Sequence, residues 1–331
     1  METADDVMHD LVVHDEAVNR LGQSIWVGAE PTYTDRFSES PEWLYEALGD
    51  DKLNRAEQLL ARLAGGRKGA AVLRCVGRQY GDEPRPRWSL GLYARRDGTR
   101  VWPGPPDPAV VDRPRPENQP PPDRTLMAAA LARVLRSTEL NARTVEAPMT
   151  NRVVFRADGE APPDRIEDEP LLSRPSLHGQ RVEGAELTDA LSEAGNFLIV
   201  CEVDAGGLRL ELPKIPEVSL FQRMLSAIST AALEIGIPTL ILAGHQPPVD
   251  QTVSWMTVTP DPAVIEINMA PSPGAADLLN ELRQLEQAAA DGGLASYRLQ
   301  YNGAECDSGG GGHITLGGKR PSSSPFLTVP S

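Results

Sequence analysis

The most regular alternation of hydrophobic and polar residues lies in the second half of the chain. From Asn196, the segment NFLIVCEVDAGGLRLELP predicts a β-hairpin with residues 205–207 at its tip and alternating residues in the return strand. TVSWMTVTP and AVIEINMAP predict two further strands. Apolar residues at helical spacing predict a helix in EVSLFQRMLSAISTAALEIGIP, which Gly236 and Pro238 end, and another in GAADLLNELRQLEQAAADGG.

The first half of the chain alternates helix and strand signals. Residues 13–22 predict a short helix that ends at Gly22, and residues 41–66 predict a longer helix with leucines along one side. Between them, SIWVGAEPTYTD predicts a strand that stops at Pro31, because proline has no N–H for a sheet ladder. Residues 70–102 predict two strands and two chain reversals.

A proline-rich segment separates two parts of the chain. Residues 103–123 predict an extended connector between a part spanning 1–102 and a part spanning 124–331, which begins with a strong helix former, RTLMAAALARVLRSTEL. Residues 157–190 are polar and predict irregular loops. Strands joined by hairpins and interrupted by helices predict one composite α+β domain with a mostly antiparallel sheet and helices on one face, not a doubly wound parallel sheet.

Composition excludes several classes of function. The chain has 331 residues and a formal net charge of −15, and such an acidic surface opposes binding to nucleic acid. Cys75, Cys201 and Cys306 are too few and too widely spaced for a disulfide framework or a cysteine-rich zinc site. No apolar run approaches the roughly 20 residues that span a bilayer, and none is of signal-peptide type, so we expect a soluble, cytoplasmic protein that does not associate with membranes.

The first candidate for chemistry is the strand end GAEPT. Gly28 allows another group to approach the strand, and Glu30 stands at its exit. Taken alone, a glutamate before proline is also typical of a solvated strand end.

The second candidate is the strand VIEIN. Strand alternation places Glu266 and Asn268 on one face and Ile265 and Ile267 on the other. A carboxylate and an amide on a mostly buried strand are costly unless they are bound. The alternative is that they form the solvated side of a half-exposed strand.

The third candidate is the glycine run before His313, made of Gly309, Gly310, Gly311 and Gly312. A fixed glycine loses about 0.5–1 kcal/mol relative to alanine, so a run followed directly by the strand pattern HITLGG indicates a required geometry. The alternative is a flexible linker.

Four segments resemble the amidoligase domain that forms the C-terminal half of large bacterial transglutaminase-like proteins. They are IWVGAEPTYTDRFSESPEWL, PRWSLGLYARRDGTRVW, TPDPAVIEINMAP and SGGGGHITLGGKRPSSSPFL. The resemblance extends from about Val13 to the end of the chain. That family is similar to the glutamine synthetase and glutamate–cysteine ligase superfamily, which implies a glutamine-synthetase-like catalytic domain.

The resemblance assigns roles to individual residues. GAEPTY places Glu30 at the first acid of the superfamily's opening strand, with Thr32 where a second acid is expected. PAVIEIN places Glu266 at a metal-binding acid and Asn268 at an amide, and GGGGH places His313 at the histidine.

The implied activity is an ATP-dependent ligase that joins a carboxylate to an amine. Glu30, Glu266 and His313 are expected to hold Mg²⁺ or Mn²⁺, and Asn268 to position a substrate or a water molecule. Phosphate oxygens of ATP are then expected to meet the backbone N–H groups of Gly309, Gly310, Gly311 and Gly312, with Lys319 and Arg320 as outer positive charges.

The expected substrates are a small-molecule or peptide carboxylate and an amine. Arg85 and Arg87, in DEPRPRW, are candidates for binding the substrate carboxylate, although a plain turn is an equal reading of that segment.

The sequence also departs from the superfamily pattern. A further metal-binding acid and several arginines are expected well beyond the histidine motif, yet this sequence ends shortly after His313. The resemblance therefore implies a C-terminally incomplete catalytic domain. Either another chain or a transglutaminase-like protein supplies the remaining groups, or this sequence is a fragment of a longer protein, or the site is incomplete and inactive. Two alternatives stay open: a non-catalytic binding or scaffold remnant, and a metal-dependent hydrolase that needs no nucleotide.

Overall fold

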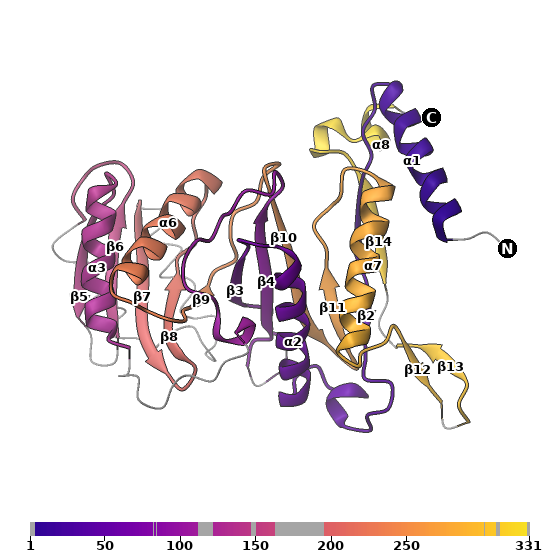
Figure 1. Ribbon diagram of the computed structural model, residues 1–331, viewed down its shortest axis with the longest axis horizontal. Coiled ribbons are helices and arrows are strands. Elements are labelled where there is room, and N and C mark those ends of the chain that lie inside the picture. The colour runs from indigo at the N-terminus through magenta and orange to yellow at the C-terminus, as the bar shows by residue number, and fades with distance from the viewer. Residues whose placement is uncertain are drawn as a thin grey trace. The chain divides into compact units, whose positions relative to one another are not determined.

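The computed structural model describes most of the chain and divides into two compact units (Figure 1). The described residues are 4–81, 83, 85–111, 122–146, 150–162, 195–300, 302–308 and 312–329. Unit 1 comprises Met1–Leu63 and Met256–Ser331, and unit 2 comprises Ala64–Trp255. Residues 112–121 of the expected connector and 163–190 of the expected loops lie outside the described residues.

Unit 2 is built on a mostly antiparallel sheet. Its strands are β3 (Ala71–Val76), β4 (Trp88–Arg95), β5 (Asn141–Glu146), β6 (Asn151–Arg156), β7 (Asn196–Asp204), β8 (Gly207–Leu212) and β9 (Ile241–Gly244). They follow the order β4-β3-β9-β8-β7-β6-β5, and β9 pairs in parallel with both of its neighbours.

Two helices cover one face of this sheet. The helices α3 (Arg124–Ser137) and α6 (Val218–Glu234) pack side by side over it (Figure 1). Alternate residues of β6 and β7, such as Phe155 and Phe197, enter the same core as both helices, whereas Val154 points to the opposite face. The predicted α+β class, the hairpin from Asn196 and both helices are therefore confirmed.

The strands β5 and β6 were not predicted. Charged residues interrupt the apolar alternation there, yet Arg152 is only 2% exposed in the folded sheet. Val200 of β7 stands opposite both Arg152 of β6 and Glu211 of β8, so all three side chains point to the same face of the sheet. Strand pairing therefore places two opposite charges on one face. Burial lowers the pKa of the Arg152 guanidinium, and the charge of Glu211 on a distant strand acts against this effect.

Unit 1 contains short strands and four helices among its described residues. The strands are β1 (Trp26–Glu30), β2 (Thr32–Tyr33), β10 (Val253–Asp261), β11 (Val264–Asn268), β12 (Tyr297–Leu299), β13 (Glu305–Asp307) and β14 (His313–Gly317). The helices are α1 (Ala4–Arg20), α2 (Asp50–Gly66), α7 (Ala275–Asp291) and α8 (Pro325–Thr328). In this unit β11 pairs with β2 and β10, β1 pairs with β14, and β12 pairs with β13. The strand β10 begins in unit 2, and the last turn of α2 lies there.

The predicted strand break at Pro31 is confirmed, but the chain continues in the same direction. The Pro31 carbonyl accepts the N–H of Ile267 at 2.9 Å, and the Ala29 carbonyl accepts the N–H of Met269 at 3.0 Å. The missing N–H of proline therefore ends β1 without separating the chain from β11, and β2 follows after one residue.

The helix predicted over residues 41–66 is shorter than expected. Residues 41–43 form a 3-10 turn, and α2 begins at Asp50. The Glu42 carboxylate explains the break, because it accepts the backbone N–H of Lys52 at 2.8 Å and so caps the first turn of α2. The predicted continuous helix is therefore interrupted between the 3-10 turn and α2, and the Glu42 side chain bonds to the backbone at the start of α2.

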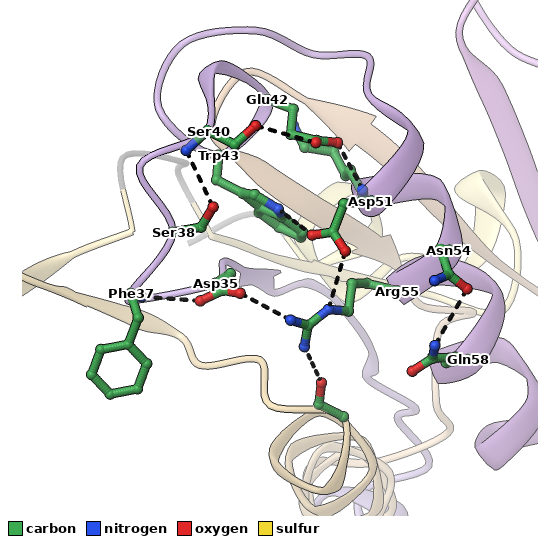
Figure 2. A network of polar contacts seen from close by, with 12 residues as sticks. Asp35, Phe37, Ser38, Ser40, Glu42, Trp43, Asp51, Asn54, Arg55 and Gln58 are labelled. Atoms are coloured by element: carbon green, nitrogen blue, oxygen red, sulfur yellow. Dashed lines mark hydrogen bonds and ion pairs between the residues drawn. The ribbon is translucent and has the colours of Figure 1, made fainter.

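A polar network ties α2 to the rest of unit 1 (Figure 2). The Arg55 guanidinium donates to the Asp35 carboxylate at 3.0 Å and to the Gly292 carbonyl at 2.7 Å. The buried Trp43 donates its indole N–H to Asp51 at 2.9 Å. These contacts join α2 to the segment after β2 and to the end of α7.

The first helix is longer than predicted and supplies a cap for α7. It begins at Ala4 instead of residue 13, and the predicted end at Gly22 is confirmed by a φ of 70°. Gly274, at the N-cap of α7, offers no side chain, but the Asp15 carboxylate of α1 accepts from the N–H groups of Ala275 at 3.2 Å and Ala276 at 3.0 Å. None of the helices in the described residues has the length and apolar character required to cross a bilayer.

We expect Asp15→Ala to lower the free energy of unfolding by about 1 kcal/mol, because it removes both the cap and a negative charge from the N-terminus of α7. Urea denaturation of the full chain measures this loss. Asp10→Ala is the matched control, since Asp10 is an exposed aspartate of the same helix. Equal stability of the two variants would contradict the capping role.

Candidate functional site

Strand register places four candidate residues, together with Thr32, on one face of unit 1, here called the polar face. Glu30 of β1 stands opposite His313 of β14, and Thr32 of β2 stands opposite Glu266 of β11. Directly opposed residues of antiparallel strands point to the same side, and so do residues two apart along a strand. Glu30, Thr32, Glu266, Asn268 and His313 therefore share this face, although they come from four strands.

One direct contact between candidate residues joins Glu30 and His313. Nδ1 of His313 lies 3.1 Å from Oε2 of Glu30, and their side chains are 68% and 37% exposed, respectively. An imidazole and a carboxylate are thus presented together toward solvent. The sequence placed both in one site, and the structure brings them into direct contact.

Glu266 is held by its neighbour on the same strand. The Asn268 amide, as oriented here, donates to Oε1 of Glu266 at 3.0 Å and also lies 3.3 Å from the hydroxyl of Thr259. Both Glu266 and Asn268 are half-buried. The predicted sharing of one face is confirmed, and the amide orients the carboxylate.

The electrostatic surroundings oppose a negative charge on Glu266. Burial is the largest cause that raises the pKa of this carboxyl above its ordinary value, and the charges of Asp261 and Glu30 raise it further. The Asn268 hydrogen bond and His313 act in the opposite direction. The Glu266 carboxyl therefore interacts electrostatically with the Glu30 and His313 pair.

A buried hydroxyl pair was not foreseen from the sequence. The side-chain oxygens of Thr32 and Ser308 lie 2.9 Å apart, and the two residues are 7% and 2% exposed. Ser308 stands directly before the glycine run, and this position was the only signal in the sequence that pointed to it.

At Gly28 another group does approach the strand, as the sequence indicated. The group that approaches it is the side chain of Thr315, which stands opposite on β14. A Cβ atom at position 28 would lie 2.7 Å from Oγ1 of Thr315. The glycine therefore allows β14, and with it His313, to pack against β1.

The glycine run and its neighbours are only partly described. Gly309, Gly310 and Gly311 lie outside the described residues, whereas Gly312 is exposed and a Cβ there would meet only the Glu30 carbonyl, at 3.7 Å. Steric crowding therefore does not require glycine at position 312. Lys319 and Arg320 follow β14 and are exposed.

The two arginines proposed for a substrate carboxylate belong to unit 2. Arg85 is exposed, and the Arg87 guanidinium forms an ion pair with Glu83 at 2.8 Å and stacks over the ring of Tyr80 at 4.2 Å. Arg87 is thus engaged within its own loop, and the substrate role of both residues stays a prediction.

The polar face offers suitable ligand types for a divalent cation, namely two carboxylates and an imidazole. Only Glu30 and His313 are in direct contact, however, since the Glu266 carboxylate is bonded to Asn268. Across the part of the chain that is described, no three His, Cys, Asp or Glu side chains converge as a metal site. Metal binding by Glu30, Glu266 and His313 therefore stays a prediction.

We expect Gly28→Ala to destabilise the chain by about 1–3 kcal/mol, because the new methyl group overlaps the Thr315 side chain. Urea denaturation provides the measurement, and Gly317→Ala is the control, since a Cβ there meets no atom within 4 Å. The double variant Gly28→Ala/Thr315→Ala should recover most of the loss. A Gly28→Ala variant as stable as Gly317→Ala would show that the close approach is unimportant.

Comparison with known proteins gave one clear match. A family model described as "Putative amidoligase enzyme (DUF2126)" covers residues 8–170 and 176–331, and so includes every residue of the polar face. No curated protein and no solved structure matches the chain, so the glutamine-synthetase-like fold stays a prediction. The resemblance carried by the four sequence segments is confirmed, and the chain belongs to this amidoligase family.

Proposed function

We propose that this chain is an ATP- and Mg²⁺-dependent carboxylate–amine ligase, or the metal- and nucleotide-binding portion of one. Family membership supports the ligase class. The observation that carries the rest of the proposal is the contact between Glu30 and His313, on the same face as Glu266 and Asn268.

The proposed reaction has two steps. A substrate carboxylate oxygen attacks the γ-phosphorus of ATP, which gives an acyl phosphate and ADP. The amine then attacks the acyl carbon, inorganic phosphate leaves and the amine loses a proton. Phosphoryl transfer mainly requires positioning and neutralisation of charge, so side chains that attract cations and backbone N–H groups are sufficient for much of this work.

Glu30 and His313 are the residues that would hold Mg²⁺ or Mn²⁺, with Glu266 as a further carboxylate. A bound divalent ion would neutralise charge on the nucleotide phosphates. Burial, and after it the charges of Asp261 and Glu30, disfavour a negative charge at Glu266, so a cation at the polar face would relieve a conflict that is present in the free chain.

Asn268 has a supporting part in this proposal. Its amide orients the Glu266 carboxylate and competes with solvent for it. The hydrogen bond therefore limits the rotation of a half-buried side chain, which lowers the entropy cost of binding a ligand in that orientation.

The remaining parts of the proposal rest on the sequence. Backbone N–H groups of Gly309, Gly310, Gly311 and Gly312 would meet phosphate oxygens, with Lys319 and Arg320 nearby as positive charges. Arg85 and Arg87 would bind a small-molecule or peptide carboxylate, and a transglutaminase-like protein or another chain would be the protein partner.

Titration calorimetry of the full chain with Mn²⁺, and then with ADP in the presence of Mn²⁺, tests this proposal. We expect the wild-type chain to bind both, and Glu30→Gln and His313→Ala each to weaken Mn²⁺ binding by at least about tenfold, because each removes a ligand. His9→Ala is the control, since His9 is an exposed histidine of α1. Absence of binding, or unchanged affinity in both site variants, would reject the proposal.

Turnover separates a ligase from the binding-only alternative. Release of phosphate from ATP that depends on both an added carboxylate and an added amine would support the complete reaction. Binding of Mn²⁺ and ADP without such turnover would favour the metal- and nucleotide-binding portion alone.

A further inference from the structure

We propose that Arg36 is the centre of a binding site for a carboxylate that is carried on a flat apolar group. The guanidinium of Arg36 donates from Nη1 to the hydroxyl of Tyr297. It also lies over two aromatic rings, with Cζ 5.3 Å from the ring centre of Tyr297 and 4.7 Å from that of Phe37. All three residues belong to unit 1, and none of them was predicted as a site residue.

The contacts of Arg36 restrict a long side chain that has many rotamers. Tyr297 is itself fixed, because it belongs to β12 and pairs with Asp307 of β13. A backbone bridge between Thr34 and Ala295 holds the two segments together, with hydrogen bonds of 2.8 and 3.0 Å. Arg36 is half-buried. Its guanidinium is therefore held in place before a ligand arrives, which lowers the entropy cost of binding.

Most N–H donors of Arg36 remain available to a ligand. A guanidinium has several N–H groups, and the contact with Tyr297 uses only Nη1. Among the described residues, no carboxylate forms an ion pair with Arg36, and its Nε and Nη2 donate to no protein acceptor. These two nitrogens form a planar fork that matches the two oxygens of a carboxylate.

The carboxylate next to Arg36 in the sequence does not compete for this fork. Asp35 accepts the guanidinium of Arg55 at 3.0 Å and the backbone N–H of Phe37 at 3.0 Å (Figure 2). Arg55 also lies 3.7 Å from Asp51. Carboxylates thus match the charge of Arg55, whereas uncharged groups position Arg36. An arginine positioned in this way is more typical of anion binding than of a structural ion pair.

The surroundings of Arg36 favour a singly charged ligand with an apolar part. One guanidinium supplies one positive charge, and Asp307 stands opposite Tyr297, so a carboxylate is better matched than a phosphate dianion. Phe37 is 70% exposed, and its ring extends away from the polar network (Figure 2). This ring offers a flat apolar surface beside the guanidinium, on which a planar group can pack. The inferred ligand is therefore an aromatic carboxylate, for which benzoate is the simplest probe.

NMR of the benzoate signals, with the full chain at constant ionic strength, tests the site. We expect the wild type to bind benzoate with a dissociation constant of about 1 mM, and Arg36→Gln to weaken binding at least about tenfold. Arg36→Lys keeps the charge but loses the fork, so it should weaken binding about fivefold. Arg20→Gln is the matched control, since Arg20 is an exposed arginine of α1. No binding in the wild type, or equal binding in Arg36→Gln, would overturn the inference.

Other small molecules test the class of ligand. Benzamide has the ring without the charge, acetate has the charge without the ring, and inorganic phosphate adds a second charge. Each should bind at least about fivefold more weakly than benzoate. Phe37→Ala should weaken benzoate more than acetate, and Tyr297→Phe should weaken both, because it removes the hydroxyl that holds the guanidinium. Binding of any of the three as tight as that of benzoate would overturn the assignment to an aromatic carboxylate.

Chemical modification locates the bound benzoate. Phenylglyoxal reacts with accessible guanidinium groups, and mass spectrometry of peptides from the full chain reads the reaction at each arginine. Benzoate at about ten times its dissociation constant should slow the modification of Arg36 about tenfold and leave Arg20 unchanged. Equal rates at Arg36 with and without benzoate would contradict the site. The inference does not rest on the proposed function, because these experiments need neither a metal ion nor a nucleotide.

Discussion

The register of the antiparallel strands in unit 1 is the constraint on which the candidate site depends. It sets Glu30 opposite His313 and Thr32 opposite Glu266. A shift of one residue in either pairing would turn these side chains to the other side of the strands. On that other side of β11, Ile265 and Ile267 are fully buried, so the same shift would also expose the core. Burial of apolar residues therefore enforces the geometry of the polar face.

Residues without chemistry of their own hold this register. Pro31 interrupts the ladder but keeps its carbonyl bonded to β11, and Gly28 leaves room for the Thr315 side chain between β1 and β14. Both arrangements act on strands that carry residues of the polar face, so the packing of these strands and the geometry of the site are linked in unit 1.

Burial opposes charge in both units. In unit 2 it lowers the pKa of Arg152, whereas Arg74 there binds Asp107 in a bidentate contact and Arg209 pairs with Asp204. On the polar face of unit 1, burial raises the pKa of Glu266, and the charges of Asp261 and Glu30 raise it further. A charge conflict that is kept in a folded protein is more typical of a binding site than of a structural ion pair.

Much of the fold could be predicted from the sequence, because alternation, helical spacing, proline and glycine act locally. These signals predicted α3, α6 and the hairpin from Asn196. They also identified Glu30, Glu266 and His313 as candidate site residues. They missed β5 and β6, where the burial of Arg152 depends on strand pairing, and they missed the break before α2, where Glu42 supplies a cap from outside the helix. By itself, the sequence determined which residue types are available and where the chain turns. Only the tertiary structure decided that Glu30 meets His313 and that Thr32 meets Ser308, because register between distant strands is set by burial and cross-strand hydrogen bonds that no local pattern contains.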